Sequence, residues 1–272
     1  MNLEDLIGNT PIIKLKRIPE NPNVTIYCKL EGQNPGGSVK DRAALGMING
    51  ALERGEIKPG DKLVEATSGN TGIAMAMICA MKGLDMTLIM PESATEERKQ
   101  SMRAFGAELI LTPADKTIEY SRTLAQEMVD EKGYFMLNQF GNDDNYKMHE
   151  RTTGPEIWRD TRGEVTHFVS SMGTTGTIMG VSRYLKSQNP NIQIVGTQPT
   201  EGSSIPGIRR WSKEFLPTIF DESRVDRTID VSEDEATAMT RRLAKEEGIS
   251  GGMSSGGALT AAMKVAGEID EG

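Results

Sequence analysis

The sequence predicts an α/β fold made of open, mainly parallel sheets that helices cover on both faces. Short apolar runs alternate with longer runs of helical periodicity along the whole chain, which is the pattern of β-α-β units. Glycine-rich turns separate the two kinds of run. The 272 residues suffice for one large domain or two modest ones, and the turn-rich segment 141–145 is the best candidate for a junction.

The first half of the chain supplies most of this alternation. Strands are expected at 11–15, 26–30, 62–67, 86–90, 109–111 and 134–140. Helices are expected at 43–52, in a stretch that ends at 83, at 93–106 and at 117–133. Ser38 is the predicted N-cap of the first helix, and Ser93 opens a capping box for the third.

The second half repeats the pattern with one long irregular stretch. Strands are expected at 167–171 and 193–197, each preceded by a helix, and a capping box at 232–235 opens a further helix. A serine-glycine turn at 254–257 is predicted to precede the last helix, at 258–269. The irregular segment 200–220 is long for a compact domain, which is typical of a functional loop.

Composition excludes several classes of function. The chain has 31 Lys and Arg against 39 Asp and Glu, a net charge of −8, so no nucleic-acid partner is expected. No apolar run is long enough for a membrane span, and the acidic start is unlike a signal peptide, so we expect a cytoplasmic protein. The chain has two cysteines and two histidines without ligand spacing, so no metal site is expected.

Lys40 is the candidate catalytic residue. It follows a glycine-rich turn at 35–38 and falls in the first turn of the predicted helix. The positive end of the helix dipole and burial under the turn both disfavour the charged amine. A neutral amine is the form needed for a Schiff base or for abstracting a proton. Taken alone, Lys40 is also compatible with a solvated surface lysine beside Asp41 and Arg42.

Two further glycine-rich turns resemble anion sites. Residues 68–72 (SGNTG) and 173–177 (GTTGT) each lie between a strand and a helix, where backbone N–H groups and hydroxyls converge on an anion. The second suits a phosphate, although neither the nucleotide P-loop nor the dinucleotide fingerprint is present. A tight turn with an N-cap explains 68–72 equally well. An activated amine, a phosphate cradle and a small-anion loop together suit pyridoxal phosphate facing a substrate that carries a carboxylate.

The motifs in combination resemble those of the cysteine synthases, which are fold-type II pyridoxal-phosphate enzymes. The resemblance covers essentially the whole chain and rests on residues 7–11 (IGNTP), 37–42 (GSVKDR), 67–72 (TSGNTG) and 173–177 (GTTGT). Residues 201–211 (EGSSIPGIRRW) resemble the B-type branch of that family. The resemblance implies a smaller domain at 35–144 with the substrate-carboxylate loop. It also implies a larger domain at 1–34 plus 145–272 with the phosphate site, and a cofactor cleft between the two.

The resemblance also implies roles for individual residues. Lys40 would hold the cofactor and later move the α-proton, and Asn70 would hydrogen-bond the hydroxyl of the cofactor ring. The phosphate would be bound by Gly173, Thr174, Thr175, Gly176 and Thr177. The substrate carboxylate would be bound by Thr67, Ser68, Gly69, Thr71 and Gln139. Arg209 and Trp211 would accept bulkier or more anionic partners, or form only a structural stack in an exposed loop.

The implied reaction is replacement of the acetoxy group of O-acetylserine by sulfide or thiosulfate, through an α-aminoacrylate intermediate. A homodimer is implied, and so is a possible complex with the C-terminal peptide of a serine acetyltransferase. The family pattern continues with an apolar strand and a small polar residue facing the pyridine nitrogen, and neither is among these 272 residues. If the chain is truncated there, we expect looser cofactor binding and a sheet edge open to pairing.

Three alternatives stay open at this point. A related enzyme such as a serine/threonine dehydratase or cystathionine β-synthase would differ in its product, pyruvate or cystathionine in place of cysteine. A regulatory homologue without activity would keep the fold and bind partner peptides, although the intact Lys40 and Asn70 disfavour it. A nicotinamide oxidoreductase is disfavoured because the dinucleotide fingerprint is missing.

Overall fold

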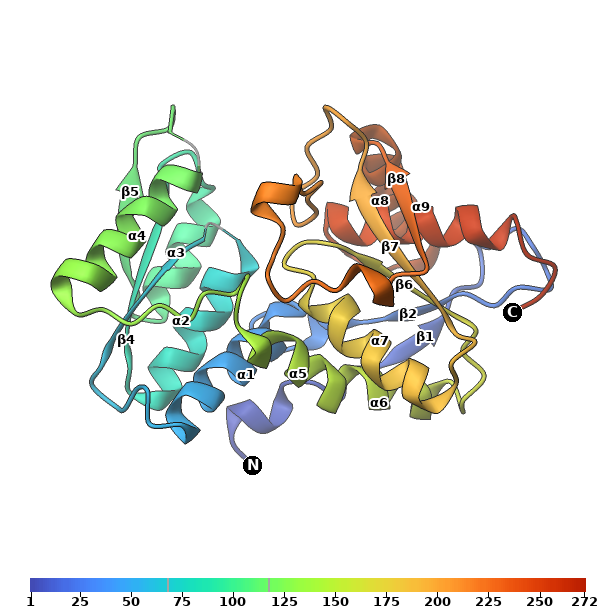
Figure 1. Cartoon of the computed structure of the whole chain (residues 1–272). Coiled ribbons are helices and arrows are strands. Elements are labelled where there is room, and N and C mark those ends of the chain that lie inside the picture. The colour runs from blue at the N-terminus through green and yellow to red at the C-terminus, as the bar shows by residue number, and fades with distance from the viewer. Residues whose placement is uncertain (68, 117) are drawn as a thin grey trace. The chain divides into compact units, whose positions relative to one another are not determined.

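The computed structural model describes residues 1–67, 69–116 and 118–272, and the chain divides into two compact units (Figure 1). The first unit comprises Met1–Gly8 and Gly32–Asn145, and the second comprises Asn9–Glu31 and Tyr146–Gly272. Each unit is an α/β layer structure with its own parallel sheet, so the predicted fold class is confirmed. In contrast to the predicted domain limits, the N-terminal eight residues group with the first unit.

The first unit is organised around a parallel sheet in the order β3-β4-β5. Its strands are β3 (Lys62–Ala66), β4 (Asp85–Pro91) and β5 (Glu108–Thr112). Its helices are η1 (Leu3–Leu6), α1 (Lys40–Glu53), α2 (Asn70–Lys82), α3 (Glu96–Ala104) and α4 (Ile118–Lys132). Two elements lie at the unit boundaries, namely η2 (Glu31–Gln33) and α5 (Asp143–Arg151).

The central strand explains why this sheet is buried on both faces. In β4 the run from Met86 to Met90 is fully buried, as expected for a parallel strand that has helices on either side. On one face Val64, Ala66 and Ile89 pack with Ala125 and Met128 of α4. On the other face a Cβ on Gly72 of α2 would lie 3.3 Å from Leu88, so α2 sits directly against the sheet.

The second unit repeats the design with β7 as the central strand. Its sheet, in the parallel order β6-β7-β8, contains β6 (His167–Ser171), β7 (Gln193–Pro199) and β8 (Arg227–Val231). A separate antiparallel pair joins β1 (Ile12–Lys14) to β2 (Tyr27–Lys29). The helices are α6 (Thr153–Asp160), α7 (Gly176–Gln188), η3 (Lys213–Phe215), η4 (Glu222–Arg224), α8 (Glu233–Glu247) and α9 (Met253–Ala266).

The capping box at the start of α8 is confirmed. Ser232 Oγ accepts a hydrogen bond from the N–H of Glu235, and the Glu235 carboxylate accepts one from the N–H of Ser232 at 2.7 Å. The side chains of Ala236 and Leu243, on the face that this start directs inward, are buried. The box therefore fixes both where α8 begins and which face it buries.

Several expected boundaries are wrong. The N-cap of α1 is Val39 and not Ser38, and the N-cap of α3 is Thr95 without a side-chain bond, so the predicted box at Ser93 does not form. The serine-glycine turn at 254–257 lies inside α9, because the helix begins at Met253 and ends at Ala266. The strand β8 lies in a stretch for which the sequence predicted no element.

The expected strand at 134–140 is also wrong. Only Phe135 forms a bridge, to Leu63 of β3, and Asn138 then takes a φ of 54°, which no strand tolerates. The segment leaves the sheet edge at this point because its backbone N–H groups find a side chain, described below, in place of a neighbouring strand.

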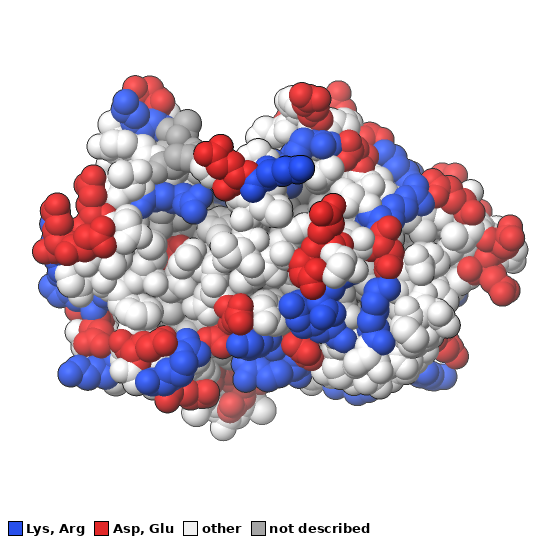
Figure 2. All heavy atoms as spheres, in the orientation of Figure 1, with Lys and Arg blue, Asp and Glu red and all other residues white. Residues whose placement is uncertain are grey.

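Charge is mixed over the face drawn in Figure 2, where Lys and Arg are interspersed with Asp and Glu. Within the described residues, none of the helices combines the length and the apolar character that crossing a bilayer requires. The same residues contain no cluster of three or more His, Cys, Asp or Glu that is able to hold a metal ion.

Candidate active site

Lys40 is the first residue of α1 and follows a turn that its own helix holds in place. The carboxylate of Asp41 accepts a hydrogen bond from the N–H of Gly36 at 2.5 Å. A Cβ at Gly36 would lie 2.5 Å from Asp41 Oδ1, so glycine is required where the turn meets the helix. Ser38 Oγ accepts from the N–H of Lys40 at 3.2 Å, which partly takes over the role of an N-cap. The backbone at Lys40 is therefore fixed from both sides.

The environment of Lys40 favours its neutral form. The side chain is partly buried, and burial lowers the pKa of its amine below the ordinary value of 10.5. The position at the helix start acts in the same direction, because the dipole presents its positive end there. A lysine with this pKa direction is a nucleophile and a base nearer to neutral pH than a solvated one.

The second sequence-predicted loop forms the start of α2 in the same unit. Gly69 is the N-cap with an extended backbone, and its N–H lies 3.4 Å from Thr67 Oγ1. Asn70 is the first helical residue and is exposed, whereas Thr67 and Thr71 are buried. Ser68, also predicted for this site, lies outside the described residues.

Gln139 joins this loop from a distant part of the sequence. Thr71 Oγ1 donates a hydrogen bond to Gln139 Oε1 at 2.9 Å, and both side chains are buried. The structure thus brings together Thr67, Gly69, Thr71 and Gln139, four of the five residues predicted for the carboxylate. Because the side-chain oxygen of Gln139 accepts the bond from Thr71, its NH₂ group is the end of the amide that is able to donate hydrogen bonds.

Glu65 is a functional candidate that the sequence did not single out. It is 4% exposed in β3, and burial raises the pKa of its carboxyl to about 7, although N–H groups of Asn138 and Gln139 and the charge of Arg122 act to lower it. The sequence does contain a feature that points to Glu65, because this glutamate interrupts the apolar strand run 63–66 two residues before Thr67. A buried carboxyl beside a proposed site is a candidate for a role there.

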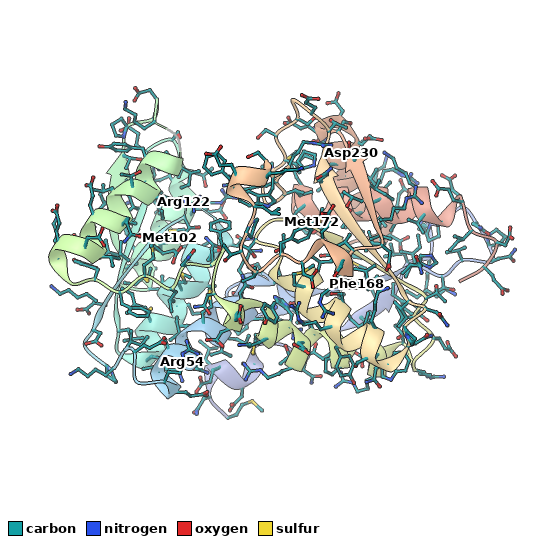
Figure 3. The ribbon with its side chains drawn as sticks, in the orientation of Figure 1. Arg54, Met102, Arg122, Phe168, Met172 and Asp230 are labelled. Carbon is teal, nitrogen blue, oxygen red and sulfur yellow. The ribbon has the colours of Figure 1, made fainter. Side chains whose placement is uncertain are left out.

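The predicted phosphate loop lies between β6 and α7 in the second unit. The chain enters it at Met172, which is labelled in Figure 3 at the end of β6. Thr175 is the N-cap of α7 with a φ of 70°, and the N–H of Gly176 lies 3.4 Å from Thr174 Oγ1. A Cβ at Gly173 would lie 2.7 Å from Gly207 O, so the loop approaches backbone closely. All five predicted residues from Gly173 to Thr177 therefore lie at one helix N-terminus.

The hydroxyl of Thr175 is the feature that points to a ligand. Its Oγ1 is buried, and within the described residues it has no hydrogen-bond partner. A buried polar atom without a hydrogen-bond partner lowers the free energy of unfolding. This hydroxyl lies at a helix N-terminus, which is a place where proteins bind phosphate oxygens. The residues present fit a phosphate group.

Trp211 and His149 support this loop from two directions. Trp211 Nε1 donates to Gly173 O at 2.8 Å, so the indole holds the loop in place. His149 is buried and contacts Thr177 Oγ1 through Nε2 at 3.3 Å and Thr153 Oγ1 through Nδ1 at 2.8 Å. His149 is one of the two histidines without metal-ligand spacing, and nothing in its local sequence pattern indicates this contact.

Arg209 stacks on the indole of Trp211, as one of the two sequence interpretations expected. The guanidinium carbon lies 5.4 Å from the ring centroid, and the N–H of Arg209 donates to Met172 O at 2.9 Å. The guanidinium is exposed, so it remains accessible to an anion while the backbone is fixed. The stack and an anion-binding role are therefore compatible.

Comparison with known proteins decides the family. A family profile described as pyridoxal-phosphate dependent enzyme matches residues 3–272. The chain belongs to this family of pyridoxal-phosphate-dependent enzymes. The orphaned hydroxyl of Thr175 and the close approach at Gly173 agree with a cofactor that carries a phosphate.

Curated relatives of this pyridoxal-phosphate-dependent enzyme are similar over nearly their full length. Cysteine synthase B of Pseudomonas aeruginosa is 58% identical over 268 residues, which are 98% of this chain and 90% of that protein. Cysteine synthase B of Escherichia coli is 56% identical over 264 residues, which are 97% of this chain and 87% of that protein. The crystal structure of a cysteine synthase from Entamoeba histolytica has a TM-score of 0.92 at 39% identity and covers 97% of this chain and 82% of that one. The predicted family resemblance is confirmed.

Proposed function

We propose that this enzyme is a cysteine synthase of the B type, which replaces the acetoxy group of O-acetyl-L-serine by sulfide or thiosulfate. The observation that carries the proposal is 58% identity to a cysteine synthase B over 98% of the chain. Lys40 at the start of α1 and the hydrogen bond between Thr71 and Gln139 support it, because they place an amine and a group of buried polar side chains in one unit.

Lys40 is proposed to act twice. Its Nζ holds the cofactor covalently, and burial favours the neutral amine that this bond requires. When it is free, the same Nζ would take the proton from the α-carbon of the substrate. The amine then has a proton to return to the α-carbon after the new bond has formed.

The two anion sites are proposed to divide the binding work. Thr67, Ser68, Gly69, Thr71 and Gln139 bind the substrate carboxylate and so orient the α-carbon toward Lys40. Asn70 bonds the ring hydroxyl of the cofactor. The five residues from Gly173 to Thr177 bind its phosphate, with the N-terminus of α7 behind them.

Pyridoxal phosphate, when bound, supplies a ring that withdraws electrons from the α-carbon and makes loss of its proton feasible. The residues of the chain then act on the groups that leave and bind at the β-carbon of the substrate. Acetate leaves the β-carbon with the bonding pair, and sulfide or thiosulfate forms the new bond at that carbon. Arg209, held at Trp211, is proposed to favour the more anionic donor, thiosulfate.

Product analysis tests the proposal. The purified chain is incubated with pyridoxal phosphate, O-acetylserine and sulfide, and we expect one cysteine for each acetate released. Pyruvate as the main product would identify a dehydratase-type enzyme, and an absence of both products would support a regulatory homologue. Serine with homocysteine serves as the matched test for cystathionine formation.

Assembly and location are proposed from the family resemblance. A homodimer, a cytoplasmic location and binding of a serine acetyltransferase C-terminal peptide each belong to this proposal. Sedimentation of the purified chain tests the first, and titration with a synthetic peptide tests the last. A monomer that turns over at full rate would remove the dimer from the proposal.

A further inference from the structure

Glu65 lies at the sheet edge where the segment that carries Gln139 leaves the sheet. Phe135 pairs with β3 through two backbone hydrogen bonds of 2.9 Å, one from its N–H to Lys62 O and one from the N–H of Val64 to Phe135 O. Beyond that bridge no backbone acceptor of β3 pairs with the N–H groups of Asn138 and Gln139 within the described residues. The Glu65 carboxylate takes that place, with Oε2 3.2 Å from the N–H of Asn138 and a second bond from the N–H of Gln139.

Side chains hold the rest of this turn as well. Asn142 Nδ2 donates to Leu137 O at 2.9 Å, and Asn145 Nδ2 donates to Gln139 O at 2.8 Å. The two carbonyls are thus satisfied by neutral amides, and the two N–H groups by one carboxylate. Asn138 keeps a φ of 54° in the middle of the turn, a conformation that needs such support.

The turn determines where the Gln139 side chain points. Its Oε1 accepts from Thr71 Oγ1 at 2.9 Å, so the glutamine bridges from the Glu65-bound backbone to the first turn of α2. All these residues belong to the first unit. Glu65, Gln139 and Thr71 form one chain of hydrogen bonds that ends at the proposed carboxylate site.

We propose that Glu65 is a positioning residue for substrate binding, whose carboxylate holds the Asn138–Gln139 turn so that Gln139 and Thr71 meet the substrate carboxylate. This inference rests on the proposed function, since it assigns the carboxylate site its role. Glu65 acts through Gln139 and does not touch the substrate.

Because Glu65 is titratable, substrate binding is expected to depend on pH. Burial raises the pKa of Glu65 to about 7, so protonation near neutral pH removes the charge from both hydrogen bonds. The groups that act on it are Arg122 on α4, whose charge favours the carboxylate, and the two N–H groups of the turn. Figure 3 labels Arg122, which also stacks on Phe140 next to Gln139. Substrate binding is therefore expected to weaken as pH falls below 7.

A glutamine at this position would be a nearly isosteric replacement that cannot accept both hydrogen bonds. Its amide oxygen is able to accept one N–H, but its NH₂ group would oppose the other donor. For Glu65→Gln we expect the KM for O-acetylserine to rise about tenfold at pH 8, because one charge-assisted bond is lost, while kcat changes by less than about threefold. The KM of wild type should approach that of Glu65→Gln as pH falls to 6.

The experiment combines these kinetics with a direct view of the turn. In the pyridoxal-phosphate-loaded wild type, the amide proton signals of Asn138 and Gln139 are expected to titrate with a midpoint near pH 7. In Glu65→Gln neither signal should titrate in that range. Glu108→Gln is the matched control, because Glu108 is an exposed carboxylate in the same sheet that contacts Thr87 Oγ1, and its KM should stay within about twofold of wild type.

Two outcomes would overturn the inference. A KM of Glu65→Gln within twofold of wild type at pH 8 is one, and flat amide signals between pH 5.5 and 8.5 in wild type are the other. A wild type that makes no cysteine would instead reject the proposed function. The amide titration, which needs no variant and no turnover, would then still test whether Glu65 holds the turn.

Discussion

Thr175 combines a strained backbone with a buried hydroxyl that has no partner within the described residues. Its φ of 70° lies in the left-handed region, which a β-branched side chain rarely adopts. Such a conformation costs on the order of 1–3 kcal/mol, and the orphaned Oγ1 adds a desolvation cost. A residue that lowers stability in two ways is best explained by a ligand that it binds.

Replacing Thr175 by glycine should separate its effect on stability from its effect on phosphate binding. Glycine accepts a positive φ, so Thr175→Gly should raise the free energy of unfolding of the cofactor-free chain by about 1 kcal/mol. The same change removes a donor to the phosphate and should weaken pyridoxal-phosphate binding about tenfold. Urea unfolding and a cofactor titration measure the two effects, and a loss of both stability and affinity would contradict this explanation.

Glu65 is a second residue whose proposed role at the site lowers the stability of the fold. Its folded-state pKa of about 7 lies above the unfolded value of 4.5, so folding favours the protonated carboxyl. The stability that Glu65 contributes is complete below pH 4.5 and is lost as pH rises through 7. The whole change amounts to about 3 kcal/mol, an order-of-magnitude value.

Comparison with Glu65→Gln isolates this term from the other carboxylates. Relative to wild type, the glutamine variant should gain up to about 3 kcal/mol of unfolding free energy between pH 5 and pH 8. Urea unfolding of both proteins at the two pH values measures it. A difference between the proteins that does not change with pH would show that Glu65 has an ordinary pKa.

At the scale of elements, the position of α7 is set by one glycine in its interior. A Cβ at Gly180 would lie 2.1 Å from Tyr146 O and 2.7 Å from the N atom of Glu150, both on α5. The two helices therefore approach to backbone contact, and α7 carries the phosphate loop at its start. Close packing at Gly180 fixes the direction in which that helix N-terminus points.

Gly180→Ala should accordingly be costly. We expect the variant to lose about 1–3 kcal/mol of unfolding free energy through overpacking and to bind pyridoxal phosphate less tightly. Gly267→Ala is the control, because Gly267 has a φ of −78° and its added Cβ would lie 3.6 Å from the nearest atoms. Thermal unfolding compares them, and equal melting temperatures for the two variants would exclude this close contact as the determinant.

At the scale of the whole molecule, the sequence predicted the α/β class and the strand-turn-helix loops because those depend on local pattern. The buried run of β4 and the capping box of α8 formed as expected. The segment 134–140 did not, because its strand-like composition was overridden by a tertiary contact with Glu65. Thr71 with Gln139 was expected only from resemblance, since 68 residues separate them and no local signal joins them.

In the proposed function, one amine of the whole molecule, on Lys40, carries the cofactor. Borohydride reduction of the chain loaded with pyridoxal phosphate, followed by peptide mapping, tests this most directly. We predict a single stable label on the peptide that contains Lys40, and none in a Lys40→Ala variant treated in the same way. A label on any other lysine of the wild type, at comparable yield, would contradict the account.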